Sequence, residues 1–308
     1  MSKNIEKKIY GYDELLNFFI ELDLKDKIPN KFVISGKKGT GKSTFAYHLI
    51  NYLFSKKEKF KYDINKFEIN DQNKSFNLVK ELVHPNFFLI KADEGKEQIG
   101  IDKIRKSFDF INRTSMNDDY RVIMIDNAEF LNLNSSNALL KIIEEPNDKL
   151  IFILIQDSSY KMLDTIKSRC IVFKKNFSET QCISFFEKIT NYKFAEIFND
   201  NYLAKFMTCG ELIFLNNYLI ENNFQSKIDV NSVLNFYFSS QKIKSDKKFN
   251  LFLLKIIQIY LYQKNLNYFD ESSYLWYNSF FKKVSEAKKF NLDIGNLFFE
   301  FQLKNLHE

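Results

Sequence analysis

The first half of the chain alternates between two hydrophobic patterns, one typical of helices and one typical of buried strands. Residues 13–26 carry apolar side chains at helical spacing and predict an amphipathic helix, and the apolar run 31–35 predicts a buried strand. The later elements predicted in the same way are a helix over 45–54, a strand over 86–90, a helix over 101–112, a strand over 122–125, a helix over 135–145 that Pro146 ends, and a strand over 150–155. Because strands alternate with helices through residue 173, we predict an α/β fold whose parallel sheet has helices on both faces.

The second half of the chain is helical in pattern. Helical periodicity begins near Phe177, breaks at Cys209-Gly210 and is interrupted again by a polar stretch over 222–229. These breaks predict three parts: an α/β domain over 1–173, a small helical lid over 174–224 and a helical domain over 225–308.

Two further segments stand out by composition. The lysine-rich segment 56–66 predicts a solvated loop. The aromatic helices after residue 230, such as 249–262 and 274–281, fit an oligomer interface and an internal core equally well, so the pattern leaves that choice open.

Length and composition place the chain among folded globular proteins. Its 308 residues are enough for about two or three domains. Hydrophobic residues make up 45% and aromatic residues 17%, which excludes an intrinsically disordered chain. No uncharged apolar run reaches the roughly 18 residues of a membrane helix, and the most apolar stretch, 251–262, contains Lys255. The first residues lack an export signal, so we expect a cytoplasmic protein that makes no membrane contact.

Cysteine, histidine and arginine are scarce. The three cysteines, Cys170, Cys182 and Cys209, and the three scattered histidines cannot be combined by spacing into a disulfide framework or a zinc site, so no zinc is expected. The net charge of +6 comes from dispersed lysines, which is compatible with contact to nucleic acid but does not predict it. Only four of the 45 basic residues are arginines, and none follows Arg169.

The strongest signal of function is a glycine loop between a predicted strand and a predicted helix. Residues 36–43 match the phosphate-loop pattern in full, with Gly, four residues of any type, and then Gly-Lys-Ser. In this pattern, glycines let successive backbone N–H groups face phosphate oxygens, Lys42 reaches the β- and γ-phosphates, and the Ser43 hydroxyl ligates magnesium. The residues predicted to bind a nucleotide are Gly36, Lys37, Lys38, Gly39, Thr40, Gly41, Lys42, Ser43 and Thr44.

A magnesium-bound nucleotide also needs a carboxylate at the end of a neighbouring buried strand. Asp126 follows the apolar strand 122–125, so we predict that Asp126 and Ser43 together hold Mg²⁺ through the nucleotide. Hydrolysis further needs a general base, and the position after this aspartate holds Asn127, which cannot accept a proton at neutral pH. Glu129 is the remaining candidate base, and the spacing does not fix where its carboxylate points.

Three stretches give the chain a family resemblance. They are Asp-Asn-Ala-Glu-Phe-Leu-Asn over 126–132, Asn-Ala-Leu-Leu-Lys-Ile-Ile-Glu-Glu-Pro over 137–146 and Ser-Arg-Cys over 168–170. With the phosphate loop, they resemble the AAA+ subunits of bacterial clamp loaders, and more narrowly the delta-prime family of DNA polymerase III, over residues 9–177.

This resemblance implies a fold and a set of partners. The fold is a RecA-like AAA+ domain, followed by a small helical lid and a C-terminal helical collar. Through the collar, five subunits of such a complex form an open ring around primer-template DNA. The implied partners are the other clamp-loader subunits of a hetero-pentamer and, through the complex, the sliding clamp and primer-template DNA, in ATP-driven clamp loading during replication.

The Ser-Arg-Cys stretch implies a role for Arg169. An arginine at the edge of the ATPase domain can neutralise charge on a γ-phosphate bound by the neighbouring subunit, as an arginine finger acting in trans. The competing interpretation is an arginine that pairs with a surface carboxylate of its own chain.

Departures from the family pattern predict weak hydrolysis. Many members have a four-cysteine zinc module between the two nucleotide motifs, and this chain has no cysteine before Cys170. Active motor subunits place a lid arginine in a Gly-x-Leu-Arg context, where this chain has Ile213. Together with Asn127, this substitution predicts nucleotide binding with little or no ATPase activity, as in a stator subunit.

Two alternative functions compete with the stator subunit. The first is a motor-type subunit resembling gamma or tau, with Glu129 as base. The second, a small-molecule kinase, is disfavoured because its phosphate clamp needs lid arginines.

Overall fold

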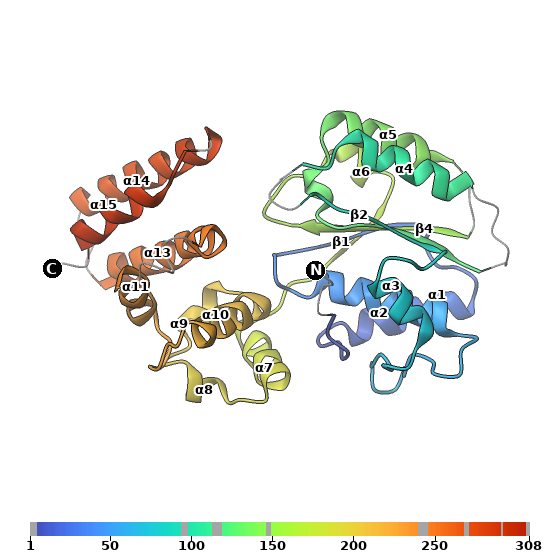
Figure 1. The fold of residues 1–308 in the computed structure, drawn as a ribbon, viewed down its shortest axis with the longest axis horizontal. Coiled ribbons are helices and arrows are strands. Elements are labelled where there is room, and N and C mark those ends of the chain that lie inside the picture. Colours follow the sequence, from blue (N-terminus) through green and yellow to red (C-terminus); the bar gives the residue numbers. More distant parts are fainter. Residues whose placement is uncertain are drawn as a thin grey trace. The chain divides into compact units, whose positions relative to one another are not determined.

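The computed structural model describes residues 5–93, 98–112, 119–145, 149–239, 246–267, 271–290 and 292–305 (Figure 1). Pro146, the predicted end of a helix, lies outside these residues. The chain forms two compact units: unit 1 is Met1–Phe185 with Thr208–Glu211, and unit 2 is Phe186–Met207 with Leu212–Glu308. The further division of the helical part into a lid and a collar at residue 224 stays a prediction.

Unit 1 is built on the parallel sheet that the sequence predicts. Its five strands lie in the order β2-β3-β4-β1-β5, and every neighbouring pair is parallel. Apolar runs form these strands because helices cover both faces of the sheet, and every residue of β4 is buried. The strands are β1 (Lys31–Gly36), β2 (Phe87–Ile90), β3 (Arg121–Ile125), β4 (Leu150–Asp157) and β5 (Ile171–Lys174).

Helices cover the two faces of the sheet in two groups (Figure 1). One face carries α1 (Asp13–Leu24), α2 (Lys42–Ser55) and α3 (Lys74–Lys80), and the other carries α4 (Ile101–Asn112), α5 (Leu133–Glu144) and α6 (Asp164–Lys167). Because successive strand side chains alternate between faces, Ile34 of β1 belongs to the core with α1 and α2, whereas Val33 belongs to the core with α4 and α5. This arrangement confirms the predicted α/β fold class.

Most predicted elements of unit 1 are present, with ends that differ by a few residues. β4 extends past its predicted end because its last two residues, Gln156 and Asp157, continue the ladder with β1. α3 has no counterpart in the prediction, since its 7 residues are too few to give a clear helical period. Its start is set by the buried side chain of Asn73, whose Oδ1 accepts a hydrogen bond from Phe76 N–H at 2.6 Å.

The lysine-rich segment 56–66 is a loop, as predicted, but it is anchored to the core. Lys59 and Lys61 are exposed, whereas Tyr62, the residue after Lys61, is buried. The Tyr62 hydroxyl lies 2.8 Å from His48 Nδ1, and Tyr62 N–H donates to Ser55 Oγ at 3.0 Å. The lysine pattern predicted the solvated side of this loop and missed the tyrosine that fixes its other side.

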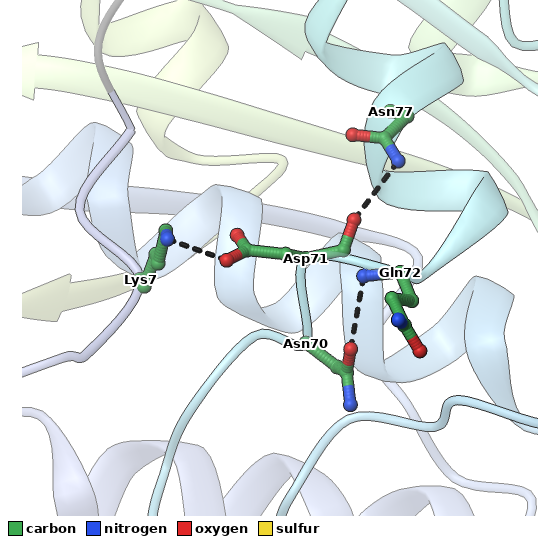
Figure 2. A network of polar contacts seen from close by, with 5 residues as sticks. All are labelled: Lys7, Asn70, Asp71, Gln72 and Asn77. Atoms are coloured by element: carbon green, nitrogen blue, oxygen red, sulfur yellow. Dashed lines mark hydrogen bonds and ion pairs between the residues drawn. The ribbon is translucent and has the colours of Figure 1, made fainter.

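A polar network attaches the start of the chain to α3 (Figure 2). Lys7 forms an ion pair with Asp71 at 2.5 Å. The Asp71 carbonyl accepts from Asn77 Nδ2 at 3.1 Å, and Asn70 Oδ1 accepts from Gln72 N–H at 2.9 Å. These contacts fix both the N-terminal segment and the turn that leads into α3.

Unit 2 is formed mainly by helices. Two helices, α7 (Glu179–Thr190) and α10 (Cys209–Glu221), contribute residues to both units. The others are α8 (Phe194–Ile197), α9 (Tyr202–Phe206), α11 (Val230–Ser239), α13 (Lys247–Asn267), α14 (Glu271–Lys289) and α15 (Gly295–Asn305). Among the described residues, no helix combines the length and the apolar character needed to cross a membrane.

Aromatic side chains make up much of the core of unit 2. The rings of Tyr218 and Phe249 are stacked with their centroids 4.0 Å apart, and Phe249 and Phe280 are buried. Tyr262 and Tyr274 remain about half exposed, at 50% and 47%. Core packing thus accounts for some of the aromatic residues after 230, and an oligomer interface formed by the exposed ones stays a prediction.

Candidate nucleotide site

The phosphate loop connects β1 to α2 and curls around its own lysine. Gly39 and Gly41 have φ angles of 79° and 80°, which residues with a Cβ rarely adopt, so the glycines permit the curl. Lys42 Nζ donates to the carbonyl oxygens of Gly36 and Lys37, both at 2.7 Å, and Lys42 is buried. The lysine and the loop therefore hold each other in place.

The other predicted loop residues lie along the same turn. Thr40 is buried, and its hydroxyl donates to Lys37 O at 2.8 Å. The side chains of Lys37 and Lys38 are exposed, and Thr44 lies half-buried in the first turn of α2. The start of α2 directs the positive end of a helix dipole toward the loop, which favours an anion there.

Ser43 and Asp126 are in contact, although 83 positions separate them in the sequence. The Ser43 hydroxyl donates to Asp126 Oδ1 at 3.0 Å. Asp126 follows β3 directly, and its N–H donates to Ile90 O at the end of β2 at 2.8 Å. Parallel strands end at the same edge of a sheet, which brings the loop after β1 and the aspartate after β3 together. A hydroxyl and a carboxylate oxygen at this distance are ligand types that Mg²⁺ prefers.

Carboxylates lie close to the ammonium group of Lys42. Burial lowers the pKa of Lys42, and the negative charges of Asp157, Glu129 and Asp126 act in the opposite direction. These carboxylates favour the charged ammonium, which is the form that binds a phosphate oxygen.

Glu129, the candidate base, is held by two hydrogen bonds. It lies in a short 3₁₀ helix (Ala128–Phe130) that follows Asn127, whose left-handed backbone, at φ 61°, suits asparagine. Asn127 Nδ2 donates to Glu129 Oε1 at 3.2 Å, and Asp157 N–H donates to Glu129 Oε2 at 3.1 Å. Burial raises the pKa of Glu129, and these hydrogen bonds oppose that shift. Its carboxylate therefore points toward the end of β4, and both of its oxygens accept hydrogen bonds.

Asp157 is a site residue that the sequence analysis did not select. It is the last residue of β4, it is paired in register with Gly36 of the phosphate loop, and it is buried. Asp157 Oδ1 accepts from Ser159 N–H at 2.9 Å. The sequence carries only a weaker form of the signal that found Asp126, because the polar Gln156 separates Asp157 from the apolar run 150–155.

Arg169 lies on the surface, after α6. Its Nε donates to Glu144 Oε1 of α5 at 2.6 Å, and Nη1 donates to Thr165 O of α6 at 3.0 Å. The side chain is 40% exposed. The structure thus brings Lys42, Ser43, Asp126 and Glu129 together. Arg169 instead pairs with a carboxylate of its own chain, which is one of the two roles that the sequence left open.

The strand order, the phosphate loop after β1 and the aspartate after β3 define the class of protein, which is the RecA-like AAA+ class of nucleotide-binding proteins. A family model described as "DNA polymerase III, delta subunit" matches residues 11–178, which include the whole sheet and the candidate site. The chain belongs to this family.

Curated relatives include two kinds of DNA polymerase III subunit. The delta' subunit of Pseudomonas aeruginosa is 29% identical over 163 residues, which are 53% of this chain and 47% of that protein. The delta' subunit of Bacillus subtilis is 27% identical over 147 residues, 47% of this chain and 42% of that protein. The gamma subunit of Buchnera aphidicola is 29% identical over 184 residues, 59% of this chain and 48% of that protein. The chain therefore spans about half the length of the curated relatives it matches.

Proposed function

We propose that this chain is a delta-prime-type subunit of a DNA polymerase III clamp loader, which binds ATP with Mg²⁺ and assists ATP-driven loading of the sliding clamp onto primed DNA. The observation that carries the proposed nucleotide binding is the 3.0 Å hydrogen bond from Ser43 to Asp126. It joins two motifs that act together when they hold a magnesium-bound phosphate. The family match and the delta' relatives support the clamp-loader part.

The proposed partners follow from the clamp-loader assignment. They are the other clamp-loader subunits in a hetero-pentamer and, through that complex, the sliding clamp and primer-template DNA. We propose a cytoplasmic location for this assembly.

The residues of the site fit the proposed ligand. The N–H groups of the loop around Gly39 and Gly41 would bind phosphate oxygens, with Lys42 contributing a positive charge. Ser43 and Asp126 would hold Mg²⁺, which supplies neutralisation of the phosphate charge when it is bound.

Weak hydrolysis is proposed from the groups near the site. Asn127 cannot accept a proton, and both carboxylate oxygens of Glu129 already accept hydrogen bonds. No arginine follows Arg169 in the sequence, so position 213 supplies an isoleucine where motor subunits have a lid arginine.

Arg169 is proposed to act in trans, on nucleotide bound by a neighbouring subunit. Its ion pair with Glu144 is partly exposed, with side-chain exposures of 40% and 54%. Exposed ion pairs contribute little free energy, about 0–1 kcal/mol, so the guanidinium can exchange Glu144 for a phosphate at low cost.

A motor-type subunit is the second candidate. The gamma relatives favour it, and so does the position of Glu129, whose charge acts on the pKa of Lys42. In this case Glu129 would exchange its hydrogen bond from Asp157 N–H for a water molecule that it activates.

The test is a titration of the purified chain with a fluorescent ATP analogue, with and without Mg²⁺, followed by an ATPase assay of the chain alone. We expect binding that depends on Mg²⁺ and turnover close to background. Ser43→Ala and Asp126→Asn should each weaken binding only when Mg²⁺ is present, because both act through the metal. Rapid turnover that Glu129→Gln abolishes would favour the motor-type subunit instead.

A further inference from the structure

The first turn of helix α10 belongs to unit 1 and contacts the phosphate loop. Thr208 Oγ1 donates to Lys38 O at 2.8 Å, and Gly210 N–H donates to Gly39 O at 2.9 Å. Thr208 and Lys38 are 170 positions apart in the sequence. Thr208 is buried, so water does not compete for its hydroxyl. We refer to residues 208–210 as the clasp.

The hydrogen bonds around Thr208 indicate that its hydroxyl serves the loop rather than capping its own helix. Thr-Cys-Gly-Glu over 208–211 is a capping-box pattern, and Glu211 makes its part of the box by accepting from Thr208 N–H at 2.8 Å. Glu211 N–H, which a capping threonine side chain would satisfy, donates instead to the Thr208 carbonyl at 3.0 Å. The single hydroxyl proton of Thr208 has two acceptors in range, and Lys38 O at 2.8 Å is nearer than Glu211 Oε2 at 3.1 Å.

Two glycines make the contact possible. A Cβ at Gly210 would lie 2.7 Å from Gly39 O, closer than real Cβ atoms approach other atoms. A Cβ at Gly39 would overlap the Thr208 hydroxyl. Larger residues at either position would therefore push the clasp and the loop apart.

The clasp acts on the N–H groups of the loop through peptide geometry. A trans peptide places its C=O and its N–H on opposite sides, and the described residues contain no cis peptide. When the carbonyls of Lys38 and Gly39 point to the clasp, the N–H groups of Gly39 and Thr40 point away from it. Backbone N–H groups of such a loop are its main phosphate ligands.

We infer that the clasp is a positioning element of the phosphate loop, in which Thr208 and Gly210 fix two peptide planes so that the N–H groups of Gly39 and Thr40 are oriented for a nucleotide phosphate. This inference rests on the proposed nucleotide binding. It adds to the site a segment from the start of α10, which neither the phosphate-loop motif nor the strand-end aspartates include.

The first experiment compares Thr208→Val with Thr208→Ser in the full chain, using a fluorescent ATP analogue with Mg²⁺. Valine has the shape of threonine but no hydroxyl, so it should weaken binding by about fivefold, the value of one hydrogen bond, whereas serine keeps the hydroxyl and should bind as the wild type does. Thr190→Val is the matched control, because the Thr190 hydroxyl donates to Phe186 O at 2.8 Å within α7. Equal affinity of Thr208→Val and wild type would overturn the inference.

A second measurement tests the clasp without nucleotide. Trypsin cleaves after lysine, and Lys37 and Lys38 are exposed in the loop. Thr208→Val should speed cleavage there relative to cleavage after the exposed Lys66, while Thr208→Ser and Thr190→Val should not. An unchanged cleavage ratio in Thr208→Val would refute the clasp. If the wild type binds no ATP analogue, the proposed nucleotide function is refuted. The cleavage ratio then still tests whether the clasp holds the loop.

Discussion

The imidazole of His48 is completely buried, and its surroundings define its protonation state. Nδ1 lies 2.8 Å from the Tyr62 hydroxyl, and Nε2 lies 3.0 Å from Glu6 O. A neutral imidazole has one donor and one acceptor, which fits a carbonyl on one side and a hydroxyl donor on the other. Burial lowers the pKa of His48 to about 4. His48 is therefore a structural residue that ties the N-terminal segment to the loop after α2.

We expect the free energy of unfolding to fall as the pH is lowered from about 6.5 toward 4. In this range the unfolded chain binds a proton at His48 and the folded chain does not, so a lower pH favours unfolding. The full shift in the His48 pKa corresponds to a loss of about 3 kcal/mol in the free energy of unfolding. Denaturant titrations at about pH 7 and about pH 5 measure the loss. His48→Gln, which cannot titrate, should show a smaller pH dependence, and an identical dependence in both proteins would argue against this explanation.

Asn127 offers a second test at the level of one residue. Its φ of 61° is costly for most side chains but not for glycine. Asn127→Ala should therefore lower the free energy of unfolding by about 1 kcal/mol, and Asn127→Gly should change it less. If the two variants unfold at the same denaturant concentration, backbone strain does not set the residue type at this position.

Among the elements, α3 begins at a buried polar side chain that also contacts two other segments. Asn73 caps α3 with its Oδ1, which also accepts from Asn51 Nδ2 at 2.9 Å, while Asn73 Nδ2 donates to Phe60 O at 2.7 Å. Asn73 thus connects α3, α2 and the lysine-rich loop. Propensity alone would not form so short a helix.

Asn73→Ala should cost more than the loss of an ordinary helix cap. The cap itself contributes roughly 1 kcal/mol, and the buried Asn51 and Phe60 groups lose their partner as well, so we expect a total of about 2–4 kcal/mol. The matched control is Asn132→Ala, because Asn132 caps α5 by accepting from Ser135 N–H at 2.8 Å and should cost only about 1 kcal/mol. Equal losses in thermal or denaturant unfolding would mean that the buried network contributes nothing.

The elements that could be predicted from the sequence are those with a long, regular pattern. The apolar runs that form β1, β3 and β4 are short and alternate with helical patterns, which favours buried strands, and the phosphate loop needs only its local motif. α3 is too short for a period, and Asp157 became a site residue only through its register with Gly36. The bond from Thr208 to Lys38 joins segments that no local pattern relates.

At the scale of the whole molecule, two helices cross the division of the chain. The first residues of α7 and of α10 belong to unit 1, and the rest of each helix belongs to unit 2. The chain also passes from unit 2 back to unit 1 between Met207 and Thr208, just before α10. The crossing in α10 lies next to Cys209-Gly210, where the hydrophobic pattern breaks, whereas no break marks the crossing inside α7. The predicted domain limits at residues 173 and 224 stay predictions.

Arg169 can be tested only in the proposed assembly. In a clamp loader reconstituted with partner subunits from the same source, Arg169→Ala should slow hydrolysis by about a thousandfold at the one site it serves, so the total ATPase rate should fall. Glu144→Gln removes the own-chain partner of Arg169 and should leave that rate close to wild type. Similar ATPase rates for both variants and wild type would mean that Arg169 does not act in trans and only forms a surface ion pair.

The geometry of Lys42 has a consequence for the speed of ligand capture. An ammonium group has three protons, and two of those on Lys42 are directed to the carbonyls of Gly36 and Lys37. The third can meet an incoming oxygen without any change of rotamer. A stopped-flow trace of association should then show no slow phase from rearrangement of this side chain.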